Sequence, residues 1–366
     1  MQNEKVYTAI GMMSGTSFDG IDVAMIETDG GAYVHPIAYA CYPYSERERD
    51  ELRKALRKAD LNDPAVKRAD KIVTDNHIVA IKDFLKQNAA NRNVDLIGFH
   101  GQTIYHNPTL KISMQIGDPA AIARAAKIAV IADMRQADIK AGGQGAPLLP
   151  LYHRALVIAS SVPRPVALLN IGGVSNLTWI GEGLEENILA FDCGPGNALI
   201  DDFIKERTGK PYDKNGELAK KGQVSQELVD SWLAHPFFDK RPPKSLDRDA
   251  WYIAGLSHIP VEDGAASLTA FTVGGILKGI QRLPQQPHHL YVTGGGRYNK
   301  FIMEKLAQTL PFPVDPVEKQ DWNGDVIEAQ GFAYLAVRSL LGLPLTLPTT
   351  TGVPKATTGG KPYRPA

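Results

Sequence analysis

Short apolar runs separated by glycine-rich turns dominate the start of the chain. One run covers residues 6–10, a second covers residues 23–26, and a third covers residues 33–39. Apolar runs of this length, bounded by turn residues, are typical of β-strands. The pattern therefore predicts three consecutive strands. The first two are joined by a long turn, residues 11–22, which we call the first glycine turn.

Helical signals follow these strands. Ser45 and Glu48 form a capping box at the start of a highly charged segment that reaches about residue 59. Asp63 and Pro64 give an N-cap followed by proline at the first helical position. Apolar residues between positions 66 and 84 then recur at helical spacing. We expect two helices here, the second with one buried face.

Strands and helices alternate over the next stretch of the chain. The pattern predicts strands at residues 94–99 and 128–132 and helices at residues 120–127 and around 151–156. The first of these strands is expected to end at His100. Three strands followed by alternating helices and strands indicate a mixed α/β layer.

The second half of the chain repeats the opening design. A predicted strand at residues 166–171 leads into a second glycine turn, residues 172–176, and a return strand follows at residues 177–180. An internal repeat of this kind predicts two related domains that face one cleft. We place domain I at residues 1–150 and domain II at residues 151–325, and we expect the C-terminal segment, residues 326–366, to pack back on domain I.

The remaining elements are predicted in the same way. A strand over residues 188–191 ends at Asp192, and a helix begins at residue 198. Residues 205–256 are polar and are expected to form loops and short helices over the cleft. A helix and a strand then precede the third glycine turn, residues 294–299, and a last helix follows. From residue 344 the Pro/Thr/Gly-rich tail is expected to have little capacity to form a core.

Composition narrows the class of protein. The 366 residues include 40 basic and 40 acidic side chains, with no block of Lys or Arg, which disfavours nucleic acid and anionic membranes as partners. The two cysteines imply no disulfide framework and fit a reducing cytosol. No signal peptide and no apolar run of bilayer length is evident. We therefore expect a cytoplasmic protein.

The first glycine turn has the composition of an anion-binding loop. Its glycines let the backbone approach a ligand, Ser14, Thr16 and Ser17 add hydroxyl groups, and consecutive turn N–H groups can form a nest for phosphate. Asp19 and Asp22 lie beside it and offer the oxygen ligands that Mg²⁺ prefers. An ordinary hairpin is the alternative, although hairpin tips need only one or two glycines. The lysine of a Walker loop is missing.

Three glycine turns, each after a predicted strand, occur in an order that resembles the actin, hexokinase and Hsp70 ATPase superfamily, in which two phosphate loops precede an adenosine loop. Within it, the chain resembles one family closely, anhydro-N-acetylmuramic acid kinase. The motifs that carry the resemblance are residues 13–22 (MSGTSFDGID), 99–103 (FHGQT), Asp138 with 142–148 (GGQGAPL), 170–173 (NIGG), 191–192 with 194–197 (FD and GPGN) and 328–330 (EAQ). These motifs span nearly the whole chain.

The resemblance implies an α/β, two-domain actin-like ATPase fold of the ribonuclease H-like type, with mixed sheets flanked by helices around a central cleft. It implies an ATP- and Mg²⁺-dependent kinase that hydrolytically opens the anhydro ring of 1,6-anhydro-N-acetylmuramic acid and phosphorylates O6. The products would be N-acetylmuramic acid 6-phosphate and ADP, in peptidoglycan recycling. The implied partners are this sugar, ATP and a second copy in a homodimer.

The resemblance also assigns roles to individual residues. Asp192 is the expected catalytic base. The expected nucleotide-binding residues are Gly15, Thr16, Ser17, Phe18, Asp19, Gly20, Ile21, Asp22, Gly172, Gly173, Gly294, Gly295, Gly296 and Asn299, with Asp19 or Asp22 holding Mg²⁺ directly or through water. The expected substrate-binding residues are His100, Gln102, Arg135, Asp138, Gln144, Gly194, Asn197 and Glu328.

Several of these residues have structural alternatives. Asp192 follows a buried strand, where a carboxylate can take a proton from water, but it can also be the N-cap of the helix that begins at residue 198. Glu328 lies early in a predicted helix, where a carboxylate favours the helix dipole. Arg135, Asp138 and Gln144 can be satisfied interdomain contacts rather than sugar ligands. The third glycine turn can be a plain strand-to-helix connection.

The chain departs from the family pattern at three places. Cys193 stands where threonine is expected, residues 246–248 read Leu-Asp-Arg where Thr-Gly-Arg is more frequent, and Gln136 and Ala137 replace arginines that some members carry. These departures concern fine substrate contacts rather than the type of reaction. We expect Cys193 to support its turn without thiol chemistry, because no obvious base or second cysteine lies near it in the sequence.

Other classes of function are the alternatives. Another sugar or acetate kinase of the superfamily would share the glycine turns. An ATP-gated binding protein of the Hsp70 type would need a large appended binding domain, and we expect none to fit in the residues after Leu343. A glycosidase needs two carboxylates and no nucleotide, so the glycine turns disfavour it.

Overall fold

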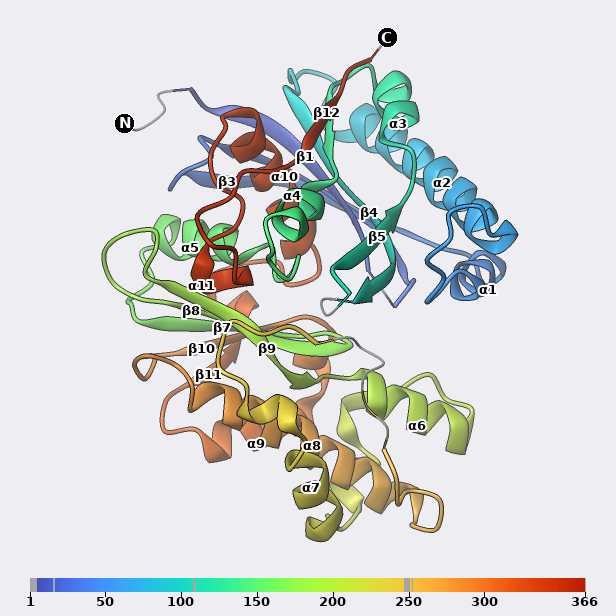
Figure 1. Cartoon of the computed structure of the whole chain (residues 1–366), viewed down its shortest axis with the longest axis vertical. Coiled ribbons are helices and arrows are strands. Elements are labelled where there is room, and N and C mark those ends of the chain that lie inside the picture. Colours follow the sequence, from blue (N-terminus) through green and yellow to red (C-terminus); the bar gives the residue numbers. More distant parts are fainter. Residues whose placement is uncertain (1–4, 16, 108–109, 247–250, 252, 366) are drawn as a thin grey trace. The chain divides into compact units, whose positions relative to one another are not determined.

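A computed structural model describes residues 5–15, 17–107, 110–246, 251 and 253–365. The chain divides into two compact units (Figure 1). Unit 1 comprises Met1–Ser161 and Val326–Ala366, and unit 2 comprises Val162–Asp325. Each unit contains one mixed sheet with helices packed on it. The predicted α/β class, with mixed sheets flanked by helices, is confirmed.

The sheet of unit 1 has seven strands in the order β12-β6-β4-β1-β2-β3, with β5 paired to β4. Strands β1, β2 and β3 form an antiparallel meander, whereas β4 is parallel to β1 and β6 is parallel to β4. The meander is the strand–turn–strand–strand pattern predicted from the sequence. The strands are β1 (Tyr7–Ser14), β2 (Gly20–Thr28), β3 (Val34–Pro43), β4 (Leu96–Asn107), β5 (Ile112–Ile116), β6 (Val130–Ala132) and β12 (Lys361–Tyr363).

The first two helices of unit 1 begin at their predicted caps. Ser45 donates its backbone N–H to Glu48 at 2.8 Å and accepts the Glu48 N–H on its hydroxyl at 3.3 Å. The Asp63 carboxylate accepts the Ala65 N–H at 2.7 Å. The helices of unit 1 are α1 (Glu46–Lys54), α2 (Pro64–Asn88), α3 (Pro119–Ala126), α4 (Met134–Lys140), α5 (Pro150–Ala159), α10 (Ile327–Leu340) and α11 (Pro348–Thr351).

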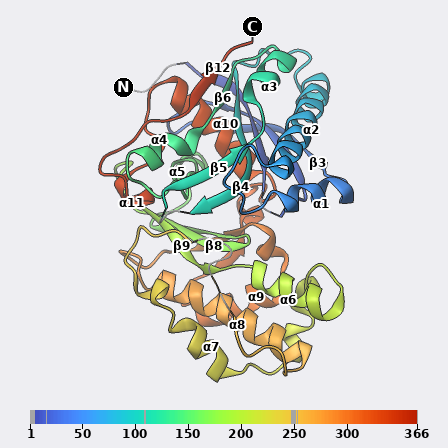
Figure 2. The same cartoon turned by 45° about the vertical axis from the view of Figure 1, so that its right-hand side comes forward.

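Helices α2 and α10 cover opposite faces of this sheet, as Figures 1 and 2 show. Alternate side chains of the central strands, among them Ile10 and Met12, join the apolar core on the α2 side. On the other face α10 lies directly against bare backbone. A Cβ atom at Gly11 would lie 1.8 Å from the Ala329 carbonyl oxygen, so only glycine fits there.

The C-terminal tail is part of the core, so the prediction that it has little core-forming capacity is wrong. Leu345, Leu347 and Val353 are buried. Strand β12 pairs antiparallel with β6, and the Tyr363 hydroxyl donates to Asp133 at 2.7 Å. The overall Pro/Thr/Gly composition hid these isolated apolar positions, because each one is buried by residues distant in the sequence.

The sheet of unit 2 has five strands in the order β11-β10-β7-β8-β9. Strands β7, β8 and β9 form an antiparallel meander, and β10 is parallel to β7. This is the same topology as β1, β2, β3 and β4, so the internal repeat predicted from the sequence is present in the sheets. The strands are β7 (Val166–Ile171), β8 (Val174–Ile180), β9 (Ile188–Pro195), β10 (Leu290–Thr293) and β11 (Val314–Pro316).

The core of unit 2 forms around the buried helix α8 and the sheet. It includes the aromatic side chains of Phe191, Phe203, Trp232, Phe238 and Phe271. Residues 205–246 form short helices and loops, as predicted. The helices are α6 (Ala198–Thr208), α7 (Gln226–Leu233), α8 (Val261–Ile280) and α9 (Lys300–Thr309), with the short 3₁₀ helices η1 (Lys214–Gly216), η2 (Ala219–Lys221), η3 (Pro236–Asp239), η4 (Gly295–Tyr298) and η5 (Val317–Gln320).

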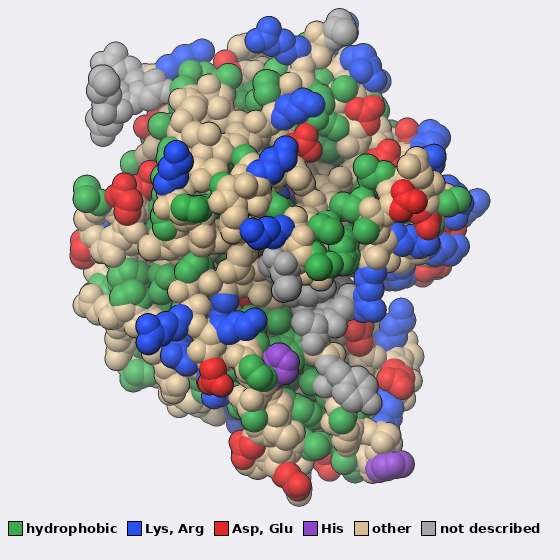
Figure 3. Space-filling model, in the orientation of Figure 1, with side chains coloured by type: hydrophobic (Ala, Val, Ile, Leu, Met, Phe, Trp, Pro, Cys, Tyr) green, Lys and Arg blue, Asp and Glu red, His purple; other side chains and the backbone are tan. Residues whose placement is uncertain are grey.

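Charged side chains of both signs are interspersed on the molecular face drawn in Figure 3. This distribution agrees with the equal numbers of basic and acidic residues in the sequence. Of the helices in the described part of the chain, none combines the length and the hydropathy that a membrane span requires.

The contact between α10 and β1 predicts a severe effect of Gly11→Ala. The added methyl group would meet the Ala329 carbonyl oxygen and, at 2.6 Å, the Ala333 amide nitrogen, neither of which can rotate away. We expect a loss of about 3 kcal/mol or more in the free energy of unfolding, measured as a lower urea midpoint.

Gly15→Ala is the matched control for this substitution. It adds the same methyl group one residue beyond the end of β1, where the nearest atom is the Ser17 Oγ at 3.7 Å. Its urea midpoint should stay close to that of the wild type. Equal midpoints for Gly11→Ala and the wild type would contradict the packing argument.

Candidate active site

The first glycine turn is fixed by polar contacts at the end of β1. The Ser14 hydroxyl donates to Gln102 Oε1 at 2.5 Å, and the Gln102 Nε2 donates to the Gly15 carbonyl oxygen at 3.1 Å. Gln102 on β4 therefore holds the start of the turn. The Ser14 hydroxyl also lies 3.2 Å from the Tyr44 hydroxyl, a contact that sequence reasoning missed.

The rest of this turn is anchored by Phe18. Its N–H donates to the Gly15 carbonyl oxygen at 3.2 Å, its φ is +58°, and its ring is buried. Asp19 is exposed, whereas Gly20, Ile21 and Asp22 already belong to β2. Gly20 is needed for packing, because a Cβ there would lie 2.5 Å from the Tyr42 carbonyl oxygen. Thr16 lies outside the described residues.

Strand β4 does not end at His100, and that detail of the prediction is wrong. The strand continues to Asn107, because residues from Gln102 onward pair with β5, which sequence reasoning missed. Gly101 permits this change of partner with a φ of +77°. As a result, His100 and Gln102 lie within a buried strand rather than in an exposed loop.

His100 and Arg135 form a buried pair. The His100 Nδ1 donates to the Gly101 carbonyl oxygen at 2.8 Å, and its Nε2 accepts the Arg135 Nε–H at 3.1 Å. This pattern requires the neutral imidazole. Burial, helped by the charge of Arg135, lowers the pKa of His100 well below its usual value. Arg135 also donates from Nη1 to the Gly145 carbonyl oxygen at 2.6 Å, so its guanidinium is held at two points.

Asp138 organises the glycine-rich segment of residues 142–147. Its carboxylate accepts the Gly145 N–H at 2.7 Å and the Thr351 hydroxyl at 2.5 Å, and the Gln144 N–H donates to the Thr351 carbonyl oxygen at 2.9 Å. The structure thus brings Asp138 and Gln144 together with Arg135. Direct sugar contact by these residues stays a prediction. Thr351 lies in the C-terminal tail and was missed, because the tail was expected to contribute little to a core.

Glu328 lies in the first turn of α10, where its carboxylate also suits the helix dipole. Burial raises the pKa of Glu328, the nearby charge of Asp22 raises it further, and the charge of Arg135 opposes the shift. Asp22 on β2 and Arg135 on α4 therefore both act electrostatically on this carboxylate. A carboxyl group with a raised pKa beside other charged groups is a frequent feature of functional sites.

In unit 2, the second glycine turn packs against the segment that ends β9. The Gly196 N–H donates to the Gly173 carbonyl oxygen at 2.9 Å, and the Asn197 N–H donates to the Gly172 carbonyl oxygen at 2.7 Å. The Asn197 side chain donates to the Ile171 carbonyl oxygen at 3.2 Å. These contacts bring together two motifs that lie more than twenty residues apart in the sequence.

Asp192 lies within β9, not at its end, because β9 continues to Pro195. Its backbone N–H donates to the Lys244 carbonyl oxygen at 2.8 Å, and its Oδ2 accepts the Leu246 N–H at 2.7 Å. The alternative role as helix cap is wrong, because the N-cap position of α6 is Asn197. Asp192 is instead a buried carboxylate oriented by residues 244–246, and residues 247 and 248 lie outside the described part of the chain.

Lys244 and Cys193 are neighbours of Asp192. Lys244 is buried, donates from Nζ to the Phe237 carbonyl oxygen at 2.9 Å, and lies over the Phe237 ring. Burial lowers the pKa of Lys244 to about 8. Burial and the charge of Asp192 raise the pKa of the Cys193 thiol, which disfavours the reactive thiolate. Gly194 has a φ of +152° and would crowd Phe238 if it carried a side chain.

The third glycine turn packs against the second. A Cβ at Gly294 would lie 2.2 Å from the Asn170 side-chain oxygen, and one at Gly296 would lie 2.3 Å from the Ile171 side chain. Only at Gly295 is there room, with Asn197 Nδ2 the nearest atom at 3.7 Å. Packing therefore requires glycine at positions 294 and 296, whereas a Cβ atom at position 295 would make only an ordinary van der Waals contact. Binding of the nucleotide by this turn stays a prediction.

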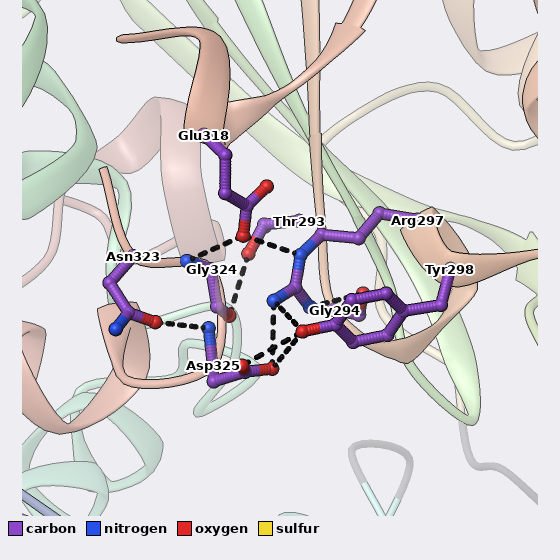
Figure 4. A network of polar contacts seen from close by, with 8 residues as sticks. All are labelled: Thr293, Gly294, Arg297, Tyr298, Glu318, Asn323, Gly324 and Asp325. Carbon is purple, nitrogen blue, oxygen red and sulfur yellow. Dashed lines mark hydrogen bonds and ion pairs between the residues drawn. The ribbon is translucent and has the colours of Figure 1, made fainter. Parts of the chain in front are cut away.

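Two further features of this turn are structural. The Asn299 side chain accepts the Phe301 and Ile302 N–H groups and so caps α9. The Arg297 guanidinium, which is 2% exposed, binds Glu318 at 2.9 Å and Asp325 at 2.7 Å, as Figure 4 shows. Sequence reasoning missed Arg297, although its place directly after three glycines was the available signal.

The described residues contain no group of three or more His, Cys, Asp or Glu side chains that could hold a metal ion. Proteins usually bind Mg²⁺ through one or two carboxylates together with substrate phosphates and water. Binding of Mg²⁺ by Asp19 or Asp22 stays a prediction.

Comparison with known proteins identifies relatives along the whole chain. A sequence profile of the family described as anhydro-N-acetylmuramic acid kinase matches residues 7–365. The protein of that name from Zymomonas mobilis is 48% identical over 96% of this chain and 98% of its own length. The one from Rhizorhabdus wittichii is 47% identical over 98% of this chain and 99% of its own length. The profile match includes every site residue described above.

Among solved structures, a ligand-bound xylulose kinase from Lactobacillus acidophilus is similar, with a TM-score of 0.44 and 10% identity over 98% of this chain and 94% of that chain. So distant a likeness carries no argument about ligands.

The buried histidines of unit 1 predict a loss of stability in mild acid. Burial lowers the pKa of His77 and of His153 from 6.5 to about 4. Between these values the unfolded chain binds more protons than the folded one, so the free energy of unfolding falls as the pH decreases through this window. We expect a decrease of about 2 kcal/mol per histidine between pH 7 and pH 5, measured by urea unfolding.

Two substitutions test whether buried histidines cause this loss of stability. His77→Gln should reduce the difference between the unfolding free energies at pH 7 and pH 5. His35→Gln, at an exposed position, should leave that difference unchanged. A wild-type urea midpoint that is the same at both pH values would contradict the prediction.

Proposed function

The chain belongs to the anhydro-N-acetylmuramic acid kinase family, and from this premise we propose that it opens the anhydro ring of 1,6-anhydro-N-acetylmuramic acid and phosphorylates O6 with ATP. The observation that carries the proposal is the family match over residues 7–365, which includes all the residues assigned a role below. The product is N-acetylmuramic acid 6-phosphate, an intermediate of peptidoglycan recycling. The protein acts in the cytoplasm as a homodimer.

The first glycine turn and Asp19 and Asp22 act on the phosphates of ATP. Turn N–H groups and hydroxyls bind phosphate oxygens, and the two carboxylates hold Mg²⁺ directly or through water. Mg²⁺, when bound, neutralises the charge that develops on the transferred phosphoryl group. The contacts that Gln102 makes with the Ser14 hydroxyl and the Gly15 carbonyl oxygen support this role, because they fix the start of the turn and involve none of its N–H groups.

The cluster around Arg135 binds the sugar in this proposal. The substrate carries a lactyl carboxylate, and an arginine held in place by His100 and the Gly145 carbonyl oxygen is suited to such a group. His100 acts through Arg135, since both of its ring nitrogens already have protein partners. Glu328 adds a carboxylate that can accept a hydrogen bond from a sugar hydroxyl. Asp138, whose two oxygens already accept from Gly145 and Thr351, keeps the glycine-rich segment beside Arg135 in place.

Asp192 acts as the base. A 1,6-anhydro sugar has no free O6 hydroxyl, so the proton must come from water. Asp192 removes it as the water oxygen attacks C1 from the face opposite O6. The C1–O6 bond breaks while O6 takes the γ-phosphoryl group, and ADP leaves. Phosphoryl transfer thus takes the place of the acid that a glycosidase uses to stabilise the leaving oxygen. The hydrogen bond from Leu246 to Asp192 Oδ2 supports this role by fixing the carboxylate.

The direct test is ADP release with and without 1,6-anhydro-N-acetylmuramic acid. We expect release that depends on this sugar, and no stimulation by xylulose or acetate, which the alternative kinases would use. An Hsp70-type protein would release ADP equally in the absence of any sugar. Such sugar-independent release would overturn the proposal.

Asp192→Asn tests the proposed base. Asparagine keeps the shape of the side chain but loses its basicity, so turnover should fall by about 10²–10⁴-fold while ADP binding, measured by calorimetry, stays nearly unchanged. Asp230→Asn, on the exposed face of α7, is the control and should keep full turnover. Near-normal turnover by Asp192→Asn would mean that another group is the base.

A reaction in ¹⁸O-labelled water tests the sequence of bond changes. The label should enter the product at C1 and not in the transferred phosphoryl group. NMR taken before mutarotation should detect the α-anomer first, because attack opposite O6 inverts C1. Label in the phosphate, or an initial β-anomer, would exclude this mechanism.

A further inference from the structure

The Tyr298 side chain is exposed and yet held rigidly at the end of the third glycine turn. It is 57% exposed, but its hydroxyl donates to the Asp325 carboxylate at 2.8 Å and accepts from Arg297 Nη2 at 2.7 Å. The Arg297 guanidinium carbon also lies 4.1 Å from the centre of the ring. Arg297 thus covers one face of the Tyr298 ring, and the exposed area lies on the remainder of the side chain (Figure 4).

Arg297 is itself held on every side, so it is a firm support for the ring. Its side chain is 2% exposed and donates to Glu318 at 2.9 Å and to the Gly294 carbonyl oxygen at 2.9 Å. Glu318 is fixed in turn by the Gly324 N–H at 3.2 Å. The carbonyl contact ties the position of the ring to the conformation of the third glycine turn.

An exposed tyrosine normally gains conformational entropy by moving between rotamers. Here the Arg297 guanidinium and the Asp325 carboxylate hold the Tyr298 hydroxyl, and together they fix one rotamer of this side chain. The ring also follows closely after Gly295, the one glycine of the turn at which a Cβ atom would meet no neighbour closer than ordinary van der Waals contact. A fixed aromatic surface beside bare backbone is suited to a flat, hydrophobic ligand group.

We propose that Tyr298 is the stacking surface for the purine base of the nucleotide, with Arg297 and Asp325 as positioning residues. The inference rests on the proposed function and on the expectation, from the family resemblance, that the third glycine turn receives adenosine. Base–aromatic stacking uses the ring face and not the hydroxyl, which agrees with a hydroxyl occupied by Asp325. Arg297 behind the ring adds a cation–π contact that keeps the outer face turned to the ligand.

If Tyr298 stacks on the base, it should affect binding of the purine base and leave binding of the phosphates unchanged. Binding of Mg–ADP and of Mg–tripolyphosphate, which has no base, is measured by calorimetry for the wild type and for Tyr298→Ala. We expect ADP to bind about 10-fold more weakly to Tyr298→Ala, with tripolyphosphate unaffected. Equal weakening of both ligands would show that Tyr298 only supports the turn, and unchanged ADP affinity would show that it has no role. Either result overturns the proposal.

Two milder variants cover the case in which Tyr298→Ala fails to fold. Tyr298→Phe keeps the ring but loses the contact with Asp325, and Asp325→Asn weakens the same contact from the other side. Each should weaken ADP binding by about two- to threefold, with tripolyphosphate again unaffected. Wild-type affinity for ADP in both would overturn the positioning roles. Tyr212→Ala, at a 54% exposed tyrosine of the same unit, is the control and should bind ADP normally.

Failure of the inference and failure of the proposed function give different results. A wild-type protein that binds neither ADP nor ATP lacks the proposed function altogether. A wild-type protein that binds ADP, together with a Tyr298→Ala variant that binds it equally well, keeps the proposed function and loses only the stacking role.

Discussion

The close approach of α10 to β1 and β4 is the constraint on which unit 1 depends. Glycine at positions 11 and 98 lets the helix backbone lie directly on the strands, since any side chain there would collide with the carbonyl oxygens of Ala329 or Phe332. The same helix carries Glu328 at its first turn and, near its other end, Arg338, which donates to the Gly30 carbonyl oxygen at 2.9 Å. The candidate site and the β2–β3 turn thus share one rigid support.

Unit 2 uses a related contact on a different helix. Gly279 of α8 faces the Cys193 side chain, with 2.7 Å between the sulfur and the position that a Cβ would occupy. Helix α8 therefore packs closely behind the strand that carries Asp192. In both units, glycine on one side of a helix–strand contact lets an element that carries a carboxylate of the candidate site, Glu328 or Asp192, pack closely against its neighbour.

Local signals predicted much of the fold. The capping box at Ser45 and the N-cap at Asp63 were readable because all their parts lie within a few residues. Strand β5, helix α4 and the C-terminal strand β12 were missed, because each depends on pairing or burial by distant residues.

The same limit applies to the candidate site. The glycine turns were evident in the sequence, but the packing of Gly294 and Gly296 against residues 170 and 171 was not, since it depends on β7 and β10 being neighbours.

The division of unit 1 into two chain segments has a consequence for biosynthesis. Unit 2 is continuous and can complete its core once residue 325 has left the ribosome, whereas unit 1 must wait for Val326–Ala366. Until then the face of the sheet around Gly11 and Gly98 lacks its helix, and the edge of β6 lacks β12. The N-terminal segment of the nascent chain therefore leaves this sheet face and strand edge uncovered throughout the synthesis of unit 2, and uncovered apolar surface and strand edges are the features that favour aggregation.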